Sequence, residues 1–221
     1  MGNNVWEEVF ASQAWGKYPA EPLIRFIARN FYGHDREKIR ILELGCGPGA
    51  NLWFLAREGF SFLGIDFSPS AVEQAMTRLD VECPGWRSRG MIQVGDITHS
   101  DFGEEVFDAI IDNECVYCLP FYQSVQIYSK AKSALKKGGK IFVRTFTPET
   151  WGFQTGTQLG DYFFECNEGP LANKGTARFT PREQIQELLN GYVDFKVEKT
   201  TTTLMNEQKV VSEWIVEAIK S

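Results

Sequence analysis

The 221-residue chain lacks three features that would each assign it to a broad class of proteins. It contains no apolar run of membrane-spanning length, which argues against a transmembrane helix. It contains no long run of lysine or arginine, and its formal net charge is −6, so an extended surface for nucleic-acid phosphates is not expected. A secretory leader is also not expected, because residues 1–4 lead directly into polar, amphipathic sequence.

Cysteine is scarce and odd in number, with five residues in the chain. Without a leader, reduced thiols and a cytoplasmic location are expected. Cys115 and Cys118 have Cys-x-x-Cys spacing, but zinc needs two further ligands. The other cysteines are scattered, and both histidines, His34 and His99, lie far away in the sequence. The pair therefore favours small residues in a turn, and no metal centre is predicted.

The stretch from Ile41 to Asn51 organises the rest of the chain. It begins with apolar residues typical of a strand covered on both faces of a parallel sheet. It then breaks into glycines at positions 45, 47 and 49, and helical spacing of apolar residues follows. Strand, glycine turn and helix together are typical of a nucleotide site in a doubly wound sheet. An ordinary tight turn is the alternative.

Two acidic residues sharpen this interpretation. Glu43 precedes Gly45 by two residues, and a carboxylate there repels a pyrophosphate but suits an ammonium or sulfonium ion. Asp66 ends the next apolar run, 21 residues after Gly45, where an acidic side chain can bind both hydroxyls of a ribose. With the motifs Glu43–Gly49 and Gly64–Ser68, the sequence resembles the class I methyltransferases that depend on S-adenosylmethionine (SAM).

The resemblance implies an α/β fold: a Rossmann-like, doubly wound, seven-stranded and mostly parallel sheet with an antiparallel last strand and helices on both faces. Strands are expected at 39–44, 62–66, 91–94, 107–112, 140–146, 193–199 and 210–216. Helices are expected at 5–15, 23–31, from 49, from 68, at 121–136 and from 180, with Ser68 and Thr180 as N-caps and Lys136 and Lys137 in the last turn of the helix ending at 136. We expect one domain over residues 1–221, with 1–36 as a helical lid and 147–179 as an acceptor-side insertion.

The resemblance also implies SAM as cofactor and S-adenosylhomocysteine (SAH) as product. Asp96 is expected at the adenine and Asp112 and Asn113 at the methionyl group, while Trp15 and Tyr18 are lid aromatics. As alternatives, the two aromatics only pack helices and Asp96 only caps a turn. The full expected set of cofactor-binding residues is Trp15, Tyr18, Glu43, Gly45, Cys46, Gly47, Gly49, Asp66, Phe67, Ser68, Asp96, Ile97, Asp112 and Asn113.

The acceptor is expected to be a small molecule. Residues 113–116 occupy the place where amine methyltransferases acting on bases or protein side chains carry Asn/Asp-Pro-Pro-Tyr/Phe, and that motif is absent. With the acidic net charge, this absence argues against nucleic acid, and no membrane partner is expected. A general base is needed only if the acceptor loses a proton during attack, and the candidates are Glu114, Tyr117 and His99. Glu114 as an exposed turn carboxylate is the alternative.

Candidate acceptor-binding residues lie at the end of the fifth strand, on the edge where open α/β sheets bind ligands, and in the segment after it. They are Arg144, Phe146, Trp151, Tyr162 and Arg178. Arg144 pairs either with an acidic acceptor or with a carboxylate of the protein itself. Arg178 alternatively forms a salt bridge at a helix start, and the aromatics of 147–179 alternatively pack as core.

Other functions fit the glycine motif less well. Gly45 to Ala50 also satisfies the looser dinucleotide pattern Gly-x-Gly-x-x-Ala, but Glu43, Asp96 and the Leu-Lys-Lys-Gly-Gly segment at 135–139 argue against a nicotinamide oxidoreductase. A SAM-binding regulatory or partner protein without catalysis, and aminopropyl transfer on a similar fold, also remain open.

Overall fold

The computed structural model describes residues 3–221. Its strands are β1 (Arg40–Leu44), β2 (Ser61–Asp66), β3 (Gly90–Val94), β4 (Phe107–Asn113), β5 (Leu135–Phe146), β6 (Thr157–Gly160), β7 (Phe163–Glu165), β8 (Thr176–Arg178), β9 (Tyr192–Leu204) and β10 (Lys209–Lys220). Its α-helices are α1 (Asn3–Ser12), α2 (Glu21–Phe31), α3 (Ala50–Arg57), α4 (Pro69–Glu82), α5 (Phe121–Ala134) and α6 (Ile185–Leu188). Short 3₁₀ helices are η1 (Arg36–Lys38), η2 (Trp86–Ser88), η3 (Val116–Cys118) and η4 (Arg182–Gln184).

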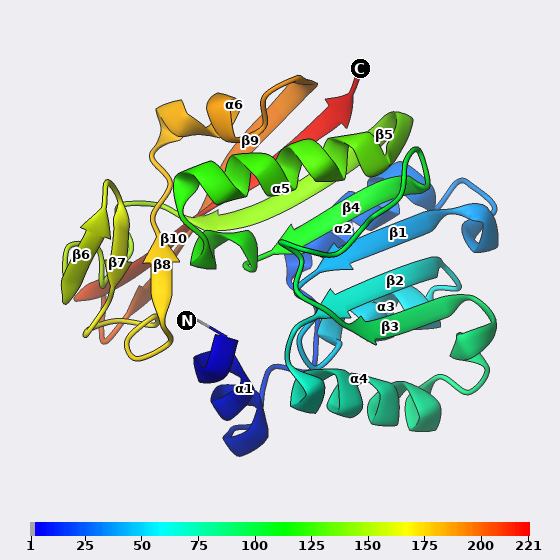
Figure 1. Cartoon of the computed structure of the whole chain (residues 1–221), viewed down its shortest axis with the longest axis horizontal. Coiled ribbons are helices and arrows are strands. Elements are labelled where there is room, and N and C mark those ends of the chain that lie inside the picture. The colour runs from blue at the N-terminus through cyan, green and yellow to red at the C-terminus, as the bar shows by residue number, and fades with distance from the viewer. Residues whose placement is uncertain (1–2) are drawn as a thin grey trace.

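Within residues 3–221, seven strands form one sheet in the order β3-β2-β1-β4-β5-β10-β9. Strands β1 to β5 pair in parallel, and β10 runs antiparallel to both of its neighbours. The predicted doubly wound sheet with an antiparallel last strand is therefore confirmed. Strand order reverses at β1, and the carboxyl ends of the parallel strands share one edge, beside α1 and β8 (Figure 1). Open α/β sheets bind ligands at such a point.

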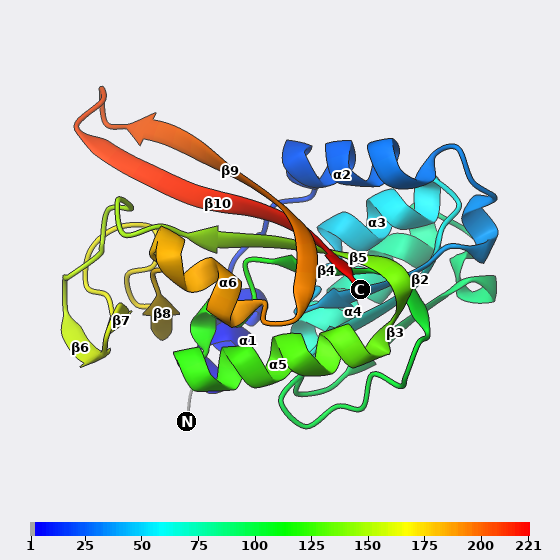
Figure 2. The same ribbon diagram turned by 90° about the horizontal axis from the view of Figure 1, so that it is seen from above.

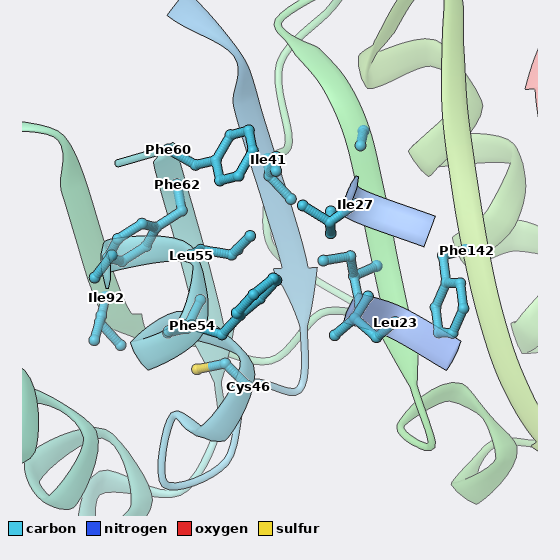
Figure 3. Close-up of a cluster of buried hydrophobic side chains, with 14 of the residues drawn as sticks. Leu23, Ile27, Ile41, Cys46, Phe54, Leu55, Phe60, Phe62, Ile92 and Phe142 are labelled. Atoms are coloured by element: carbon cyan, nitrogen blue, oxygen red, sulfur yellow. The ribbon is translucent and has the colours of Figure 1, made fainter. Parts of the chain in front are cut away.

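Two apolar cores lie on opposite faces of this sheet. Helices α2, α3 and α4 cover one face, with Leu23, Leu55 and Phe60 fully buried against Ile41 of β1. Figure 3 shows these side chains converging on the central strands. Helices α5 and α6 cover the other face (Figure 2). Burial on both faces explains why the central strands read as continuous apolar runs.

Helix α4 begins as the sequence predicts. Ser68 is its N-cap, and the Ser68 hydroxyl accepts a hydrogen bond from the Ala71 backbone N–H. Pro69 takes the first helical position, where its missing N–H costs nothing. The Glu7 carboxylate of α1 accepts hydrogen bonds from the Ser68 and Ser70 hydroxyls and so ties α1 to this helix start.

Two helix predictions were wrong. Helix α5 ends at Ala134 and not at 136, and Lys136 contacts both oxygens of Asp108 on β4, at 2.8 and 2.9 Å, instead of a helix end. Thr180 caps no helix. Its N–H donates to Phe146 and its carbonyl accepts from the Trp214 indole, so both backbone groups are used on the sheet. The next helical turn begins only at Arg182.

Residues 147–179 contain more regular structure than the sequence indicates. Strands β6, β7 and β8 form a separate antiparallel sheet within the described residues. A small core lies behind it, in which Phe153 contacts Phe164 and Phe179. Strands β9 and β10 are longer than predicted and extend as a hairpin past the main sheet (Figure 2).

Candidate active site

A cavity of about 990 Å³ lies at the carboxyl edge of the parallel strands. Helix α1, the turns after β1 to β4, strands β5 and β10 and residues 163–176 all contribute to its walls. Of the predicted site residues it is lined by Trp15, Tyr18, Glu43, Gly45, Cys46, Gly47, Asp66, Phe67, Asp96, Ile97, His99, Asn113, Glu114, Tyr117, Arg144 and Phe146. It also takes in Trp6, Phe10, Phe163, Lys174 and Glu213, which were not predicted. Among the residues described, five lining side chains are carboxylic acids and two, Arg144 and Lys174, are permanent cations.

The glycine turn brings the backbone of β1 close to its neighbours. Gly45, Gly47 and Gly49 all have positive φ angles, which favour glycine. A Cβ on Gly45 would collide with the Cys115 side chain, and one on Gly49 would lie 2.8 Å from the Cβ of Ala75 on α4. Gly49 is thus used for helix packing and does not line the cavity, contrary to its predicted place in the site. A Cβ on Gly47 would face Phe10 of α1 instead.

Glu43 lies at the floor of the cavity and is 2 % exposed. Its Oε1 accepts a hydrogen bond of 2.6 Å from Asn51, while its Oε2 has no partner within residues 3–221. Burial, together with a smaller effect of the neighbouring Asp66 and Asp112, raises the pKa of Glu43 to about 8. A buried carboxylate without a cation favours a positively charged ligand.

Asp66 ends β2 and faces the same cavity. Its two oxygens accept backbone hydrogen bonds from Gly47, at 2.8 Å, and Ser68, at 2.9 Å. Burial raises the pKa of Asp66 although both bonds oppose the shift. Ser68 itself is fully buried as the α4 cap, so it does not line the cavity as predicted.

Asp96 and Ile97 form the wall beyond β3. The Asp96 carboxylate accepts hydrogen bonds from the Thr98 N–H and hydroxyl, at 2.8 and 2.7 Å. Burial raises the pKa of Asp96, but the bonds from Thr98 and His99 outweigh it and hold the pKa below its usual value. Lys130 of α5 supports this loop by donating to the Ile97 carbonyl at 2.6 Å. His99 is largely exposed at the rim.

Asp112 does not reach the cavity, so its expected contact with a methionyl group is not supported. It is 1 % exposed, and it accepts hydrogen bonds from the N–H groups of Cys115 and Val116 and from the Tyr128 hydroxyl. The side chain points to the α5 face of the sheet and shapes the turn that follows β4. Asn113 does line the cavity, with its Oδ1 unpartnered within the described chain.

Three charged side chains meet at the β5 side of the cavity. Arg144 lies 2.6 Å from Glu213 of β10 and 3.3 Å from Glu114. Arg144 thus pairs with carboxylates of the protein itself, which is one of the two choices that the sequence leaves open. Burial raises the pKa of Glu114 well above its usual value, and the adjacent Glu213 raises it further. Glu213 was not predicted as a site residue, although an acidic residue inside an apolar strand is a signal that could have indicated it.

Helix α1 and the segment after it cover one side of the cavity. Trp6 and Phe10 of α1 pack against each other and against Trp15. Lys174 approaches from the opposite wall, with its Nζ 5.3 Å from the centre of the Trp15 ring. Tyr18 is largely exposed at the edge.

Three predicted acceptor residues lie outside the cavity. Tyr162 stacks on Phe153, and the Trp151 indole donates to Glu168. Arg178 is 1 % exposed and donates to the Leu119 carbonyl at 2.9 Å and to the Ser124 hydroxyl. Burial lowers the pKa of Arg178. Phe163, Leu171 and Lys174 face the cavity from this segment instead.

All five cysteines are free thiols. Within residues 3–221, no group of three or more His, Cys, Asp or Glu side chains is arranged to hold a metal ion. None of the helices in that span has the length and apolarity needed to cross a membrane.

Comparison with known proteins links this architecture to a family. Residues 41–139 match the family model described as "Methyltransferase domain". The magnesium-protoporphyrin O-methyltransferase of Rhodobacter capsulatus is 27% identical over 137 residues, which cover 62% of this chain and 58% of that protein. The 18S rRNA (guanine-N(7))-methyltransferase of Bos taurus is 27% identical over 116 residues, covering 48% and 38% respectively. The matched part of this chain therefore spans little more than half of the first relative and less than two fifths of the second.

The fold also matches a solved structure over nearly its whole length. A SAM-dependent methyltransferase from Methanosarcina mazei superposes with a TM-score of 0.69 at 18% identity, covering 91% of this chain and 98% of that one. At this identity the likeness concerns the fold.

Proposed function

Because the chain is, over residues 41–139, a member of the class I SAM-dependent methyltransferase family, we propose that this protein transfers the methyl group of SAM to a small-molecule acceptor. When bound, SAM supplies an already activated methyl group on a sulfonium ion, so the protein contributes binding and alignment. Such alignment can contribute about 7–11 kcal/mol to a barrier at best.

Glu43 carries this proposal. Glu43 lines the cavity, and its buried Oε2 lacks a partner within the described residues. A nicotinamide dinucleotide would place a pyrophosphate near this carboxylate, and the two negative charges would repel each other. A ligand carrying ammonium and sulfonium groups would instead balance the charge.

The remaining donor contacts follow from the walls described above. We assign Asp66 to the ribose hydroxyls, Asp96 and Ile97 to the adenine, and Gly45, Cys46 and Gly47 to backbone contacts. Asn113 and Phe67 complete this side of the cavity. Trp6, Phe10 and Trp15 would exclude water from the reacting atoms.

A small-molecule acceptor is favoured by how the cavity is closed. Helix α1 and residues 163–176 contribute to its walls, and the charged side chains of the lining are mostly acidic. A nucleic-acid acceptor would require basic contacts to phosphates. Since one relative is an rRNA methyltransferase by name, RNA belongs among the acceptors tested.

The test has two stages. SAM and SAH should raise the melting temperature of the protein by mass action, whereas NAD should not. Release of SAH should then be measured against pooled small metabolites and against RNA. Stabilisation by NAD alone would contradict the proposal. Binding of SAM without turnover on any acceptor would favour a non-catalytic regulatory protein.

A further inference from the structure

The acceptor end of the cavity holds more negative than positive charge. Glu114, Arg144 and Glu213 line it from the turn after β4, from β5 and from β10. The Arg144 guanidinium contacts both carboxylates and no other carboxylate. Neither glutamate forms a second ion pair within residues 3–221. When Glu114 and Glu213 are both ionised, the Arg144 guanidinium neutralises one of the two negative charges, and the other remains.

This arrangement disfavours an anionic acceptor. A carboxylate or phosphate group would have to displace Glu213, which is 4 % exposed and lies 2.6 Å from Arg144. The entering anion would also face Glu114 across the same guanidinium. Burying a further negative charge here is costly because the low polarity of the site weakens screening.

Tyr117 provides an aromatic wall beside this cluster. It lines the cavity and is 3 % exposed. The Tyr117 ring packs edge-on against Phe146, with the ring centres 5.0 Å apart. Aromatic rings beside carboxylates are a suitable surface for a cation.

We propose that the methyl acceptor is an amine, bound as its ammonium ion between Glu114 and Glu213 and beside the Tyr117 ring. This inference rests on the methyltransferase function proposed above. When Glu114 and Glu213 are both ionised, the ammonium supplies the one positive charge that the cluster lacks. A neutral alcohol would leave that excess negative charge in place.

The same carboxylates provide the proton acceptor that an amine needs. Glu114 takes one proton from the ammonium ion and leaves a lone pair on nitrogen. The nitrogen forms a bond to the methyl carbon, and the carbon–sulfur bond breaks with its electron pair remaining on sulfur. The products are a methylated ammonium ion, a protonated Glu114 and a neutral sulfide. Burial and the adjacent Glu213 raise the pKa of Glu114, which favours transfer of the proton to this carboxylate when it is ionised.

The test compares three probes that differ only in the reacting end: phenethylamine, 2-phenylethanol and phenylacetate. Each is titrated by calorimetry into the full-length protein saturated with SAH. We expect the amine to bind about tenfold more tightly than the alcohol, since a charge-assisted hydrogen bond replaces a neutral one. An equal or stronger response to the alcohol or the acid, or no response to any of the three, overturns the proposal.

Variants separate this inference from the proposed function. Glu213→Gln and Glu114→Gln should each lose the preference for the amine while SAH affinity stays within about twofold. Glu217→Gln is the matched control, because Glu217 lies on the same strand but pairs with Arg29 and does not line the cavity. If the wild-type protein fails to bind SAH, the methyltransferase proposal itself fails. If SAH binds and the amine preference survives in both variants, only the acceptor inference fails.

Discussion

The two oxygens of Asp66 accept hydrogen bonds from the N–H groups of Gly47 and Ser68. We predict that Asp66→Ala weakens SAH binding by about 10- to 100-fold, because hydrogen bonds to charged groups contribute roughly 1.5–3 kcal/mol. Calorimetry measures the change. Asp161→Ala, at an exposed position outside the cavity, is the control and should bind normally.

Near-native affinity of the Asp66→Ala protein would remove Asp66 from the donor site. A loss of affinity accompanied by unfolding would assign Asp66 to the structure of the glycine turn alone. Circular dichroism on the same sample distinguishes these two results.

The place of a residue in the cavity was predicted well where a short sequence motif determines it, and poorly where contacts distant in sequence determine it. Glu43, Gly45 and Asp66 follow from short motifs whose spacing places them in the cavity. Glu213 depends on the register of β10 against β5, where it lies opposite Phe146, and no local pattern gives that register. Asp112 was misplaced because its carboxylate turns toward Tyr128, a contact 16 residues away.

Among the elements, helix α1 forms a wall of the cavity and is held by a few polar contacts. We predict that Glu7→Ala loosens α1, because the variant loses the bonds to Ser68 and Ser70 at the start of α4. Hydrogen exchange of residues 5–12 should become faster, and SAH should dissociate faster. Glu8→Ala is the matched control, since Glu8 is exposed and its side chain makes no hydrogen bond or salt bridge within residues 3–221.

Equal exchange rates in the Glu7 and Glu8 variants would show that apolar packing of Trp6 and Phe10 holds this helix without help from Glu7. The lid assignment for α1 would then rest on its place in the cavity wall alone.

In the segment 147–179, two side chains that are adjacent in sequence lie in different places, one in the cavity wall and one in the small core behind it. Phe163 lines the cavity, whereas Tyr162 stacks on Phe153 behind it. We predict that Phe163→Leu raises the KM for the acceptor severalfold with little change in SAH affinity, since pocket walls fix the substrate. Tyr162→Leu should leave that KM unchanged. Steady-state kinetics on any acceptor found in the screen tests both.

The reverse pattern, with KM altered by Tyr162→Leu and not by Phe163→Leu, would contradict this assignment. It would return Tyr162 to the acceptor site expected from sequence.

Element boundaries show the same division between local and distant causes. Ser68-Pro69 marks the start of α4 correctly because the cap is formed within the turn itself. Thr180-Pro181 has the same pattern, yet the backbone N–H and carbonyl of Thr180 form hydrogen bonds to Phe146 and Trp214, which belong to the sheet. Tertiary hydrogen bonds override a local signal there. The small sheet β6–β8 was missed because its strands are three or four residues long.

For the whole molecule, several buried carboxyl groups make stability depend on pH. Burial raises the pKa of Glu43, Asp66, Asp112 and Glu114. In the unfolded chain these groups release their protons at lower pH, so the folded protein binds more protons. Its stability therefore falls as pH rises, for Glu43 from about 4.5 up to its folded pKa of about 8. The slope is at most about 1.4 kcal/mol per pH unit for each group.

We predict that the ligand-free protein unfolds at lower urea concentration at pH 8 than at pH 6. Glu43→Gln should make this decline shallower, because the amide does not titrate. Urea titrations at the two pH values measure both effects. A midpoint that rises from pH 6 to pH 8 would contradict the raised pKa of these groups.

The acidic floor of the cavity also bears on how turnover ends. Before methyl transfer the donor carries a positive sulfur, and afterwards that sulfur is neutral. Ionised Glu43, with no other cation bound to it among the described residues, then attracts the spent donor less than the fresh one. Product inhibition by SAH should therefore be weak, and the ratio of SAM to SAH affinity should fall toward one in Glu43→Gln. The loss of the positive charge on sulfur during methyl transfer would thus favour release of SAH and binding of a new SAM molecule.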